Sequence, residues 1–121
     1  MQYVQRDRGF EMNDAELSKR LIDIVGPSLV ALAAGSRNQH VARLWLGGRI
    51  AMSNPERQRL DAALECLQTV AESEGAETAR AWFIGRNVGT DETSPAEALC
   101  EGRLEDVRRS MRRLINDEHA S

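Results

Sequence analysis

The chain has 121 residues, of which 41% are hydrophobic, 29% charged and 4% aromatic. This is the composition of an ordinary globular protein, long enough to bury a core without disulfides or metal. Cys66 and Cys100 stand alone, with no CxxC motif and no pair of His nearby, so neither a disulfide framework nor a metal site is expected. With no signal peptide and no apolar run near twenty residues, we expect a cytoplasmic protein that does not enter a membrane.

The net charge of −3 is distributed very unevenly. Residues 27–60 carry five Arg and one acid, a net charge of +4, whereas residues 61–106 carry eleven acids and three Arg, a net charge of −8. From residue 107 onward, four Arg outweigh two acids, which gives +2. A basic segment next to an acidic one indicates two surfaces for two kinds of partner. The alternative is that these are solvated faces that simply differ in charge.

The chain begins with twelve residues that lack a clear period, and we expect them to form a flexible or loosely docked arm. A helix is then predicted from Asn13 or Asp14, either of which suits an N-cap, to Gly26. A second helix spans residues 27–34, with Pro27 at its first position and Gly35 as its C-terminal breaker.

Ser36, with Gln39 three residues later, predicts a capping box for a third helix that runs to about Leu46. Gly47 and Gly48 end it. Asn54, as cap before Pro55, then begins a longer helix in which apolar residues recur at intervals of three and four until Gly75.

The second half of the chain begins with a short helix over residues 76–84, in which Trp82 and Phe83 are expected to anchor the core. An irregular link follows. Ser94, Pro95, Glu97 and Gly102 then mark the start and end of another helix, and a last helix runs from Arg103 to about Asp117. No segment alternates with a period of two for long enough to form a strand. The predicted fold class is therefore all-α, and scarce aromatics in the core also favour helices.

Residues 27–46 have the pattern of a helix-turn-helix. Counted from Pro27, the fifth, ninth, fifteenth and eighteenth positions are occupied by residues that permit a tight crossing of two helices, namely Ala31, Gly35, Val41 and Leu44. The exposed face of the second helix would then carry the residues that contact DNA: Arg37, Asn38, Gln39, His40 and Arg43. The alternative is a helical hairpin in a small bundle.

The chain shows no pattern typical of an enzyme. It lacks a nucleophilic Ser motif, a glycine-rich phosphate loop after a strand, and a His placed to pair with a carboxylate in the basic half. Asp91 and Glu92 are expected to be solvated loop acids, His40 a surface residue and His119 part of a fraying tail. We expect no catalytic residues, no metal and no cofactor.

Several residues of the second half follow a known order: Trp on a short helix, Asn and Gly in a link, Pro at a helix start, Leu, Gly, and Val on a final helix. They are Trp82, Asn87, Gly89, Pro95, Leu99, Gly102 and Val107. With the upstream helix-turn-helix, this order resembles the Xre/MbcA/ParS antitoxins over residues 14–117. Two features depart from the family pattern: Arg86 replaces a Pro before the Asn, and "TDETS" replaces a Gly-Gly stretch.

The resemblance implies a bacterial type II antitoxin that covers the active-site cleft of an NAD-consuming RES-domain toxin and represses its own operon. It implies an Xre-like helix-turn-helix domain over residues 13–74, after an N-terminal arm over residues 1–12, and a toxin-binding domain over residues 75–121. The partners would be the toxin encoded by the adjacent gene, operator DNA and a second copy of the chain, as a homodimer. The residues expected to contact the toxin are Arg86, Asn87, Pro95, Leu99, Arg109 and Arg113.

Two alternatives remain open for the whole chain. It could be a stand-alone regulator whose second half mediates dimerisation, or an interaction protein whose helix-turn-helix does not bind DNA. The last helix leaves a similar choice, because its four arginines recur at i and i+4 and form one basic face: Arg108, Arg109, Arg112 and Arg113. They are either balanced by Glu105 and Asp106 on a solvated face or form a contact surface.

Overall fold

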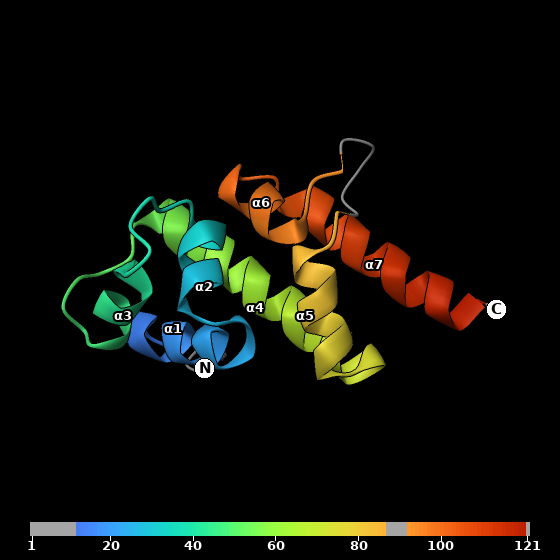
Figure 1. Ribbon diagram of the computed structural model, residues 1–121, viewed down its shortest axis with the longest axis horizontal. Helices are drawn as coiled ribbons and strands as arrows, with labels where there is room; N and C mark the ends of the chain where they lie inside the picture. The colour runs from blue at the N-terminus through green and yellow to red at the C-terminus, as the bar shows by residue number, and fades with distance from the viewer. Residues whose placement is uncertain (1–11, 87–91, 121) are drawn as a thin grey trace, which may run out of the picture.

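The computed structural model describes residues 12–86 and 92–120, and the regular elements in these ranges are seven α-helices (Figure 1). In chain order they are α1 (Asp14–Val25), α2 (Pro27–Ala34), α3 (Val41–Leu46), α4 (Asn54–Glu74), α5 (Ala76–Ile84), α6 (Pro95–Cys100) and α7 (Leu104–Ala120). The prediction of an all-α fold is confirmed for the described ranges.

Helix α4 is the centre of the fold. Its 21 residues run diagonally through the molecule, and α1, α2, α5, α6 and α7 all pack against it (Figure 1). Its inner face is apolar, with Leu60, Ala63 and Leu67 fully buried. These residues belong to one hydrophobic cluster that extends from Leu17 on α1 to Met111 on α7. Helices α1 and α7, the first and last of the described helices, therefore belong to a single core.

Helix α3 lies at one end of the molecule, and the far part of α7 lies at the other (Figure 1). Among the described helices, α3 packs only on α1 and α2. Trp45 holds it there, because its side chain is 1% exposed. The buried hydroxyl of Ser18 on α1 also donates a hydrogen bond to the carbonyl of Ala42, at 2.8 Å. Helix α3 is thus attached to the core through its packing on α1 and α2.

Three helix starts follow the predicted capping chemistry, with one shift of position. Asn13 caps α1, and Ser94 with Glu97 forms the expected capping box before α6. Before α4 the cap is Ser53, paired with Glu56, and not Asn54 as predicted. Because Asn54 already has a helical conformation, the residue before it is the one whose side chain reaches the free N–H groups.

The start of the third helix was predicted wrongly. α3 begins at Val41, five residues after Ser36, and His40 at its N-cap makes no side-chain capping bond. The Ser36 hydroxyl accepts instead from the N–H of Asn38, and Asn38 Oδ1 accepts from the N–H of His40. These local bonds compete with helix formation and hold residues 36–40 in a turn.

Two glycine turns meet at one arginine. Gly35 and Gly102 end α2 and α6 with left-handed φ angles of +88° and +80°. The Arg59 guanidinium from α4 lies between them and donates to the carbonyl of Ala34 at 3.0 Å. A Cβ on Gly35 would lie 2.6 Å from Arg59 Nη1. The backbone angle therefore favours glycine at position 35, and a side chain there would also displace the end of the Arg59 side chain.

Candidate functional site

The residues predicted to contact DNA lie together at the α3 end, but most of them are not on a helix. Arg37, Asn38, Gln39 and His40 are all exposed in the turn before α3, and Arg43 is the one residue of this set that lies on α3, where it is also exposed. The expected helical face of five polar residues is therefore replaced by a polar turn that leads into a six-residue helix. The five residues therefore lie near one another in the chain at one end of the molecule, in a geometry that differs from the predicted helical face.

Asn38 is held more firmly than its neighbours in this turn. Its backbone N–H donates to Ser36 Oγ at 3.0 Å, and its side-chain oxygen accepts from the N–H of His40 at 2.9 Å. Its carbonyl also accepts from the N–H of Val41 at 3.1 Å. Asn38 therefore shapes the entry to α3, whereas the side chains of Gln39 and Arg43 make no such bonds within the described chain.

The α3 end carries uncompensated positive charge. The side chains of Arg37, Arg43 and Arg49 are exposed and make no ion pair with any residue in the described ranges. No acidic residue occurs from position 24 to position 55. The other two arginines of the basic segment are used inside the fold, since Arg57 binds Asp14 and Arg59 binds the end of α2. We call the three exposed arginines and the turn residues 38–40 the basic end.

Arg49 contributes to the predicted positive charge of residues 27–60 but is not among the residues predicted to contact DNA. It lies in the loop between α3 and α4, next to Ile50, whose side chain is 46% exposed. Leu46, at the end of α3, is 40% exposed. A cation and two large apolar side chains are thus exposed close together in the chain, at the end of α3 and on the loop that follows it. The sequence does contain a signal for this loop, because the Gly-Gly pair that ends the helix is followed directly by Arg-Ile.

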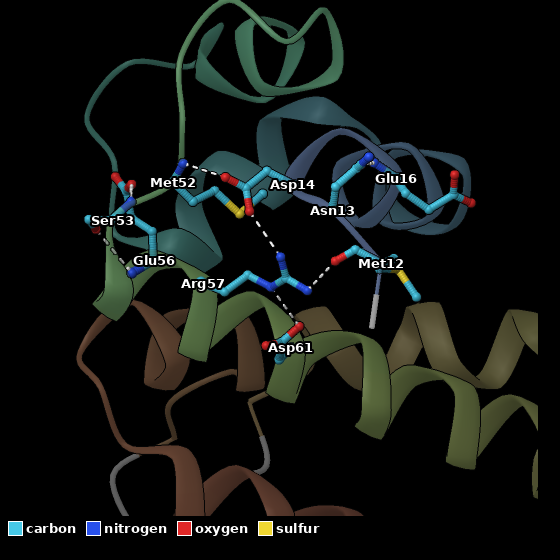
Figure 2. Close-up of polar contacts among 9 residues, drawn as sticks. All are labelled: Met12, Asn13, Asp14, Glu16, Met52, Ser53, Glu56, Arg57 and Asp61. Carbon is cyan, nitrogen blue, oxygen red and sulfur yellow. Dashed lines mark hydrogen bonds and ion pairs between the residues drawn. The ribbon is translucent and has the colours of Figure 1, made fainter. Parts of the chain in front are cut away.

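A cluster of polar contacts fixes the end of this loop, as Figure 2 shows. The Asp14 carboxylate accepts from the N–H of Met52 at 2.8 Å and from Arg57 Nη1 at 2.9 Å. Arg57 also donates to the carbonyl of Met12 at 2.6 Å and to Asp61 at 3.0 Å (Figure 2). The first turn of α1, the end of the loop and the first turns of α4 are thereby joined through Arg57.

We expect Arg57→Ala to lower the free energy of unfolding by about 1–3 kcal/mol, because it removes charge-assisted bonds from a largely covered guanidinium and leaves the Asp14 carboxylate with fewer donors. Urea denaturation measures the change. Arg20→Ala is the matched control, since Arg20 pairs with Glu16 at an exposed site and should cost about 0.5 kcal/mol or less. Equal costs for the two variants would contradict the role given to Arg57.

A hollow of about 510 Å³ lies between this loop and the start of α1. Its wall comes from α1, from Trp45 and from the loop: Asn13, Asp14, Ala15, Trp45, Gly48, Arg49, Ile50 and Ala51. The indole N–H of Trp45 is buried and has no acceptor in the described chain. The loop is therefore tied down at its ends and does not pack closely on α1 at its middle.

The second half of the chain is held together by the residues that carry the family resemblance. Trp82 on α5 is 5% exposed and donates its indole N–H to Ser110 on α7 at 3.1 Å. Leu99 and Val107 are fully buried, and Pro95 is buried beside them. The prediction that Trp82 and Phe83 anchor the core is confirmed, as Phe83 is 1% exposed.

Not all of the residues expected to contact a toxin lie at the surface. Pro95 and Leu99 are enclosed by the core, so their side chains do not reach the surface in this fold and their assignment as contact residues stays a prediction. Arg86, Arg109 and Arg113 are exposed. Asn87, and Gly89 of the same link, lie outside the described residues. The helical period that buries positions 95 and 99 had been visible in the sequence.

The arginines of α7 are engaged in ion pairs along the helix. Arg108 contacts Glu105 at 3.0 Å and Glu65 on α4 at 3.4 Å, and Arg109 contacts Asp106 at 2.9 Å. Hydrogen bonds from Arg103, and then from Arg109, lower the pKa of Asp106 below its usual value. The solvated face balanced by Glu105 and Asp106 is the arrangement found, with pairs mainly at i,i+3 spacing.

An acidic hollow of about 340 Å³ lies between α2 and α6. Its lining combines three carboxylates with one arginine and an exposed leucine: Leu32, Arg86, Glu92, Thr93, Glu97, Cys100 and Glu101. The N–H of Ser94 donates to the carboxylate of Glu97 and lowers the pKa of Glu97. Glu97 therefore stays ionised at a lower pH than an ordinary glutamate does.

The thiol of Cys66 faces α7 from α4 and is fully buried, and this burial raises its pKa to about 12. The unfolded thiol ionises near pH 9, so folding loses stability as pH rises from about 9 toward 12, where only the unfolded chain releases the proton. We expect the stability advantage of the wild type over Cys66→Ala to shrink between pH 8.5 and pH 11 in urea denaturation. A constant difference across this range would contradict the burial of the thiol.

No family model, curated protein or solved structure matches the chain. Two further observations apply to residues 12–86 and 92–120. None of their helices is both long and apolar enough to cross a membrane, and nowhere do three His, Cys, Asp or Glu side chains gather as a possible metal site. The site assignments therefore depend on geometry and charge alone.

Proposed function

We propose that the protein is a type II antitoxin that represses its own operon through the basic end and neutralises a RES-domain toxin through its second half. The observation that carries the proposal is the arrangement of the family-like residues in that half. Trp82, Leu99 and Val107 converge in the core, while Gly102 supplies the left-handed turn between α6 and α7. Residues in this order that also pack together support a common folded module.

The basic end supports the DNA-binding part of the proposal. Exposed arginines without ion-pair partners attract phosphates, and Gln39 can pair with a base edge. An α-helix with its side chains is about 10–12 Å across, so α3 can enter a major groove that is about 12 Å wide. A two-fold pair of chains would place two such ends on successive half-sites of an operator.

The acidic hollow supports the toxin-binding part. A cleft that binds a dinucleotide needs cationic groups for its phosphates, and the carboxylates of the hollow are suited to meet them. Leu32 adds an apolar contact beside these carboxylates, with 37% of its side chain exposed. Arg86, which lines the hollow, and the exposed Arg109 and Arg113 on α7 remain candidate contacts.

The DNA-binding prediction concerns Arg37 and Arg43. We expect Arg37→Ala and Arg43→Ala each to weaken binding to the promoter region and to reduce the salt slope by about one unit, because each removes a cation that neutralises a phosphate. Fluorescence anisotropy at several salt concentrations measures both quantities. Arg80→Ala is the control, since Arg80 is exposed on α5 and lies outside the basic end. Unchanged binding by both variants would exclude this surface.

The experiment that tests the whole proposal is co-expression with the product of the adjacent gene. Rescue of growth from a toxic neighbour, together with co-purification of a stable complex, supports the antitoxin function. Strong insensitivity of that complex to salt would argue against the acidic hollow as its contact. Absence of both toxicity and complex excludes the antitoxin function.

A second candidate is a stand-alone transcriptional regulator whose second half mediates dimerisation. The internal ion pairs of α7 favour it, because Arg108 and Arg109 are already satisfied by acids of the same chain. Sedimentation analysis combined with the co-expression result separates the two candidates. A dimer that binds DNA but has no protein partner identifies the regulator.

A further inference from the structure

The loop between α3 and α4 is presented to solvent in a defined position. At its start, the N–H groups of Gly47 and Arg49 donate to the carbonyls of Arg43 and Leu44 at 2.9 Å. At its end, the N–H of Met52 donates to Asp14, which Arg57 holds in place (Figure 2). Residues 49–51 between these anchors are all exposed.

The side chains on this loop combine two chemistries. Arg49 is exposed and makes no ion pair with the described chain, and Ile50 beside it is 46% exposed. A phosphate contact explains the arginine but gives no reason for an exposed isoleucine. A DNA minor groove suits both, because arginine is attracted to a narrow A·T groove and aliphatic side chains insert between its base steps.

The position of the loop relative to α3 agrees with this assignment. The loop follows immediately after α3, and Arg49 is only three residues beyond the end of that helix. If α3 occupies the major groove, Arg49 and Ile50 are therefore close enough in the chain to reach the flanking sugar-phosphate backbone and minor groove. The two acids at the end of this loop are already engaged, since Asp14 accepts from Met52 and Arg57, and Glu56 accepts from the N–H of Ser53.

We propose that Arg49 and Ile50 form a second DNA-contacting element that enters the minor groove and selects A·T-rich sequence beside the base pairs facing α3. This inference rests on the DNA binding proposed above. It gives the loop a role in specificity that the turn and α3 cannot supply, because a six-residue helix faces only a few base pairs. In this proposal the charge of Arg49 is attracted to the narrow minor groove, and the aliphatic side chain of Ile50 inserts between base steps.

Three short duplexes of matched length test the proposal with the full-length protein at low salt. One is A·T-rich, one is G·C-rich, and the third is the G·C-rich duplex with inosine in place of every guanine. Inosine removes the amino group from the minor groove and leaves the acceptors of the major groove unchanged. We expect the wild type to bind the A·T-rich and inosine duplexes on the order of fivefold more tightly than the G·C-rich duplex.

The variants separate the contribution of the loop from general DNA binding. Arg49→Ala should abolish the preference, and Ile50→Ser should reduce it, while Arg43→Ala weakens all three duplexes equally. Arg80→Ala should change nothing. Because Arg49 and Ile50 are exposed, the variants should keep the wild-type melting temperature, which circular dichroism verifies.

Two results would overturn the inference while leaving DNA binding intact. One is a wild type that does not distinguish the inosine duplex from the G·C-rich duplex. The other is an Arg49→Ala variant that weakens all three duplexes by the same factor, which identifies a phosphate contact. Failure of the wild type to bind any duplex at low salt overturns both this inference and the DNA-binding function.

Discussion

Trp82→Ala should lower the free energy of unfolding by about 3–5 kcal/mol, the largest effect that we expect from a single substitution. The indole is 5% exposed and joins α5 to α7 through its bond to Ser110. Its removal leaves a cavity next to Phe83, whose ring centroid lies 6.3 Å from that of Trp82. Urea denaturation followed by far-UV circular dichroism measures the loss.

Two further variants divide this effect into its parts. Trp82→Phe keeps most of the apolar volume and removes the N–H donor, so it should cost about 1–2 kcal/mol. Arg80→Ala on the same helix is exposed and should stay within about 0.5 kcal/mol of the wild type. A loss below 1 kcal/mol for Trp82→Ala would show that α5 is not anchored by this residue.

The second large effect is expected at the end of α2. Gly35→Ala should cost about 2–3 kcal/mol, because the φ angle of +88° strains any residue with a Cβ and the new methyl group meets Arg59 Nη1 at 2.6 Å. The displaced guanidinium would also lose its bond to the carbonyl of Ala34. The midpoint of urea denaturation measures the change.

Gly48 provides the matched control for this prediction. Its φ angle is +71°, but a Cβ there meets no atom within 4 Å, so Gly48→Ala should cost only about 1 kcal/mol for the backbone strain. In an Arg59→Ala background, the cost of Gly35→Ala should fall toward that of Gly48→Ala. If the two glycine substitutions are equally costly in the wild type, the contact with Arg59 makes no contribution.

Most helix boundaries could be predicted because they depend on local chemistry. Ser94 and Glu97 satisfy each other's backbone N–H groups whatever the rest of the fold does, and Pro95 suits the first turn of α6. The start of α3 could not be predicted in the same way. Ser36 can accept from the N–H two residues on as easily as from the N–H three residues on, and Asn38 continues the turn.

The candidate site could also be predicted only where local sequence decides it, and not where contacts between distant residues do. The sequence predicts that Arg37 and Arg43 belong to one basic surface, because both lie in a segment with almost no acids. The sequence does not reveal that Arg57 and Arg59 bind within the fold and add no free charge to this surface. Their partners, Asp14 and the carbonyl of Ala34, are distant in the chain. Which arginines remain exposed is decided by contacts that span 25 to 43 positions in the chain.

The shared position of α4 has a consequence for turnover in the cell. Five helices bury their apolar faces against it, and α3 is attached only through two of them. Neither half can therefore lose its structure while the other keeps a complete core, so unfolding of one half also exposes apolar surface of the other. A ligand that binds either half selectively in the folded state then protects the whole chain from degradation.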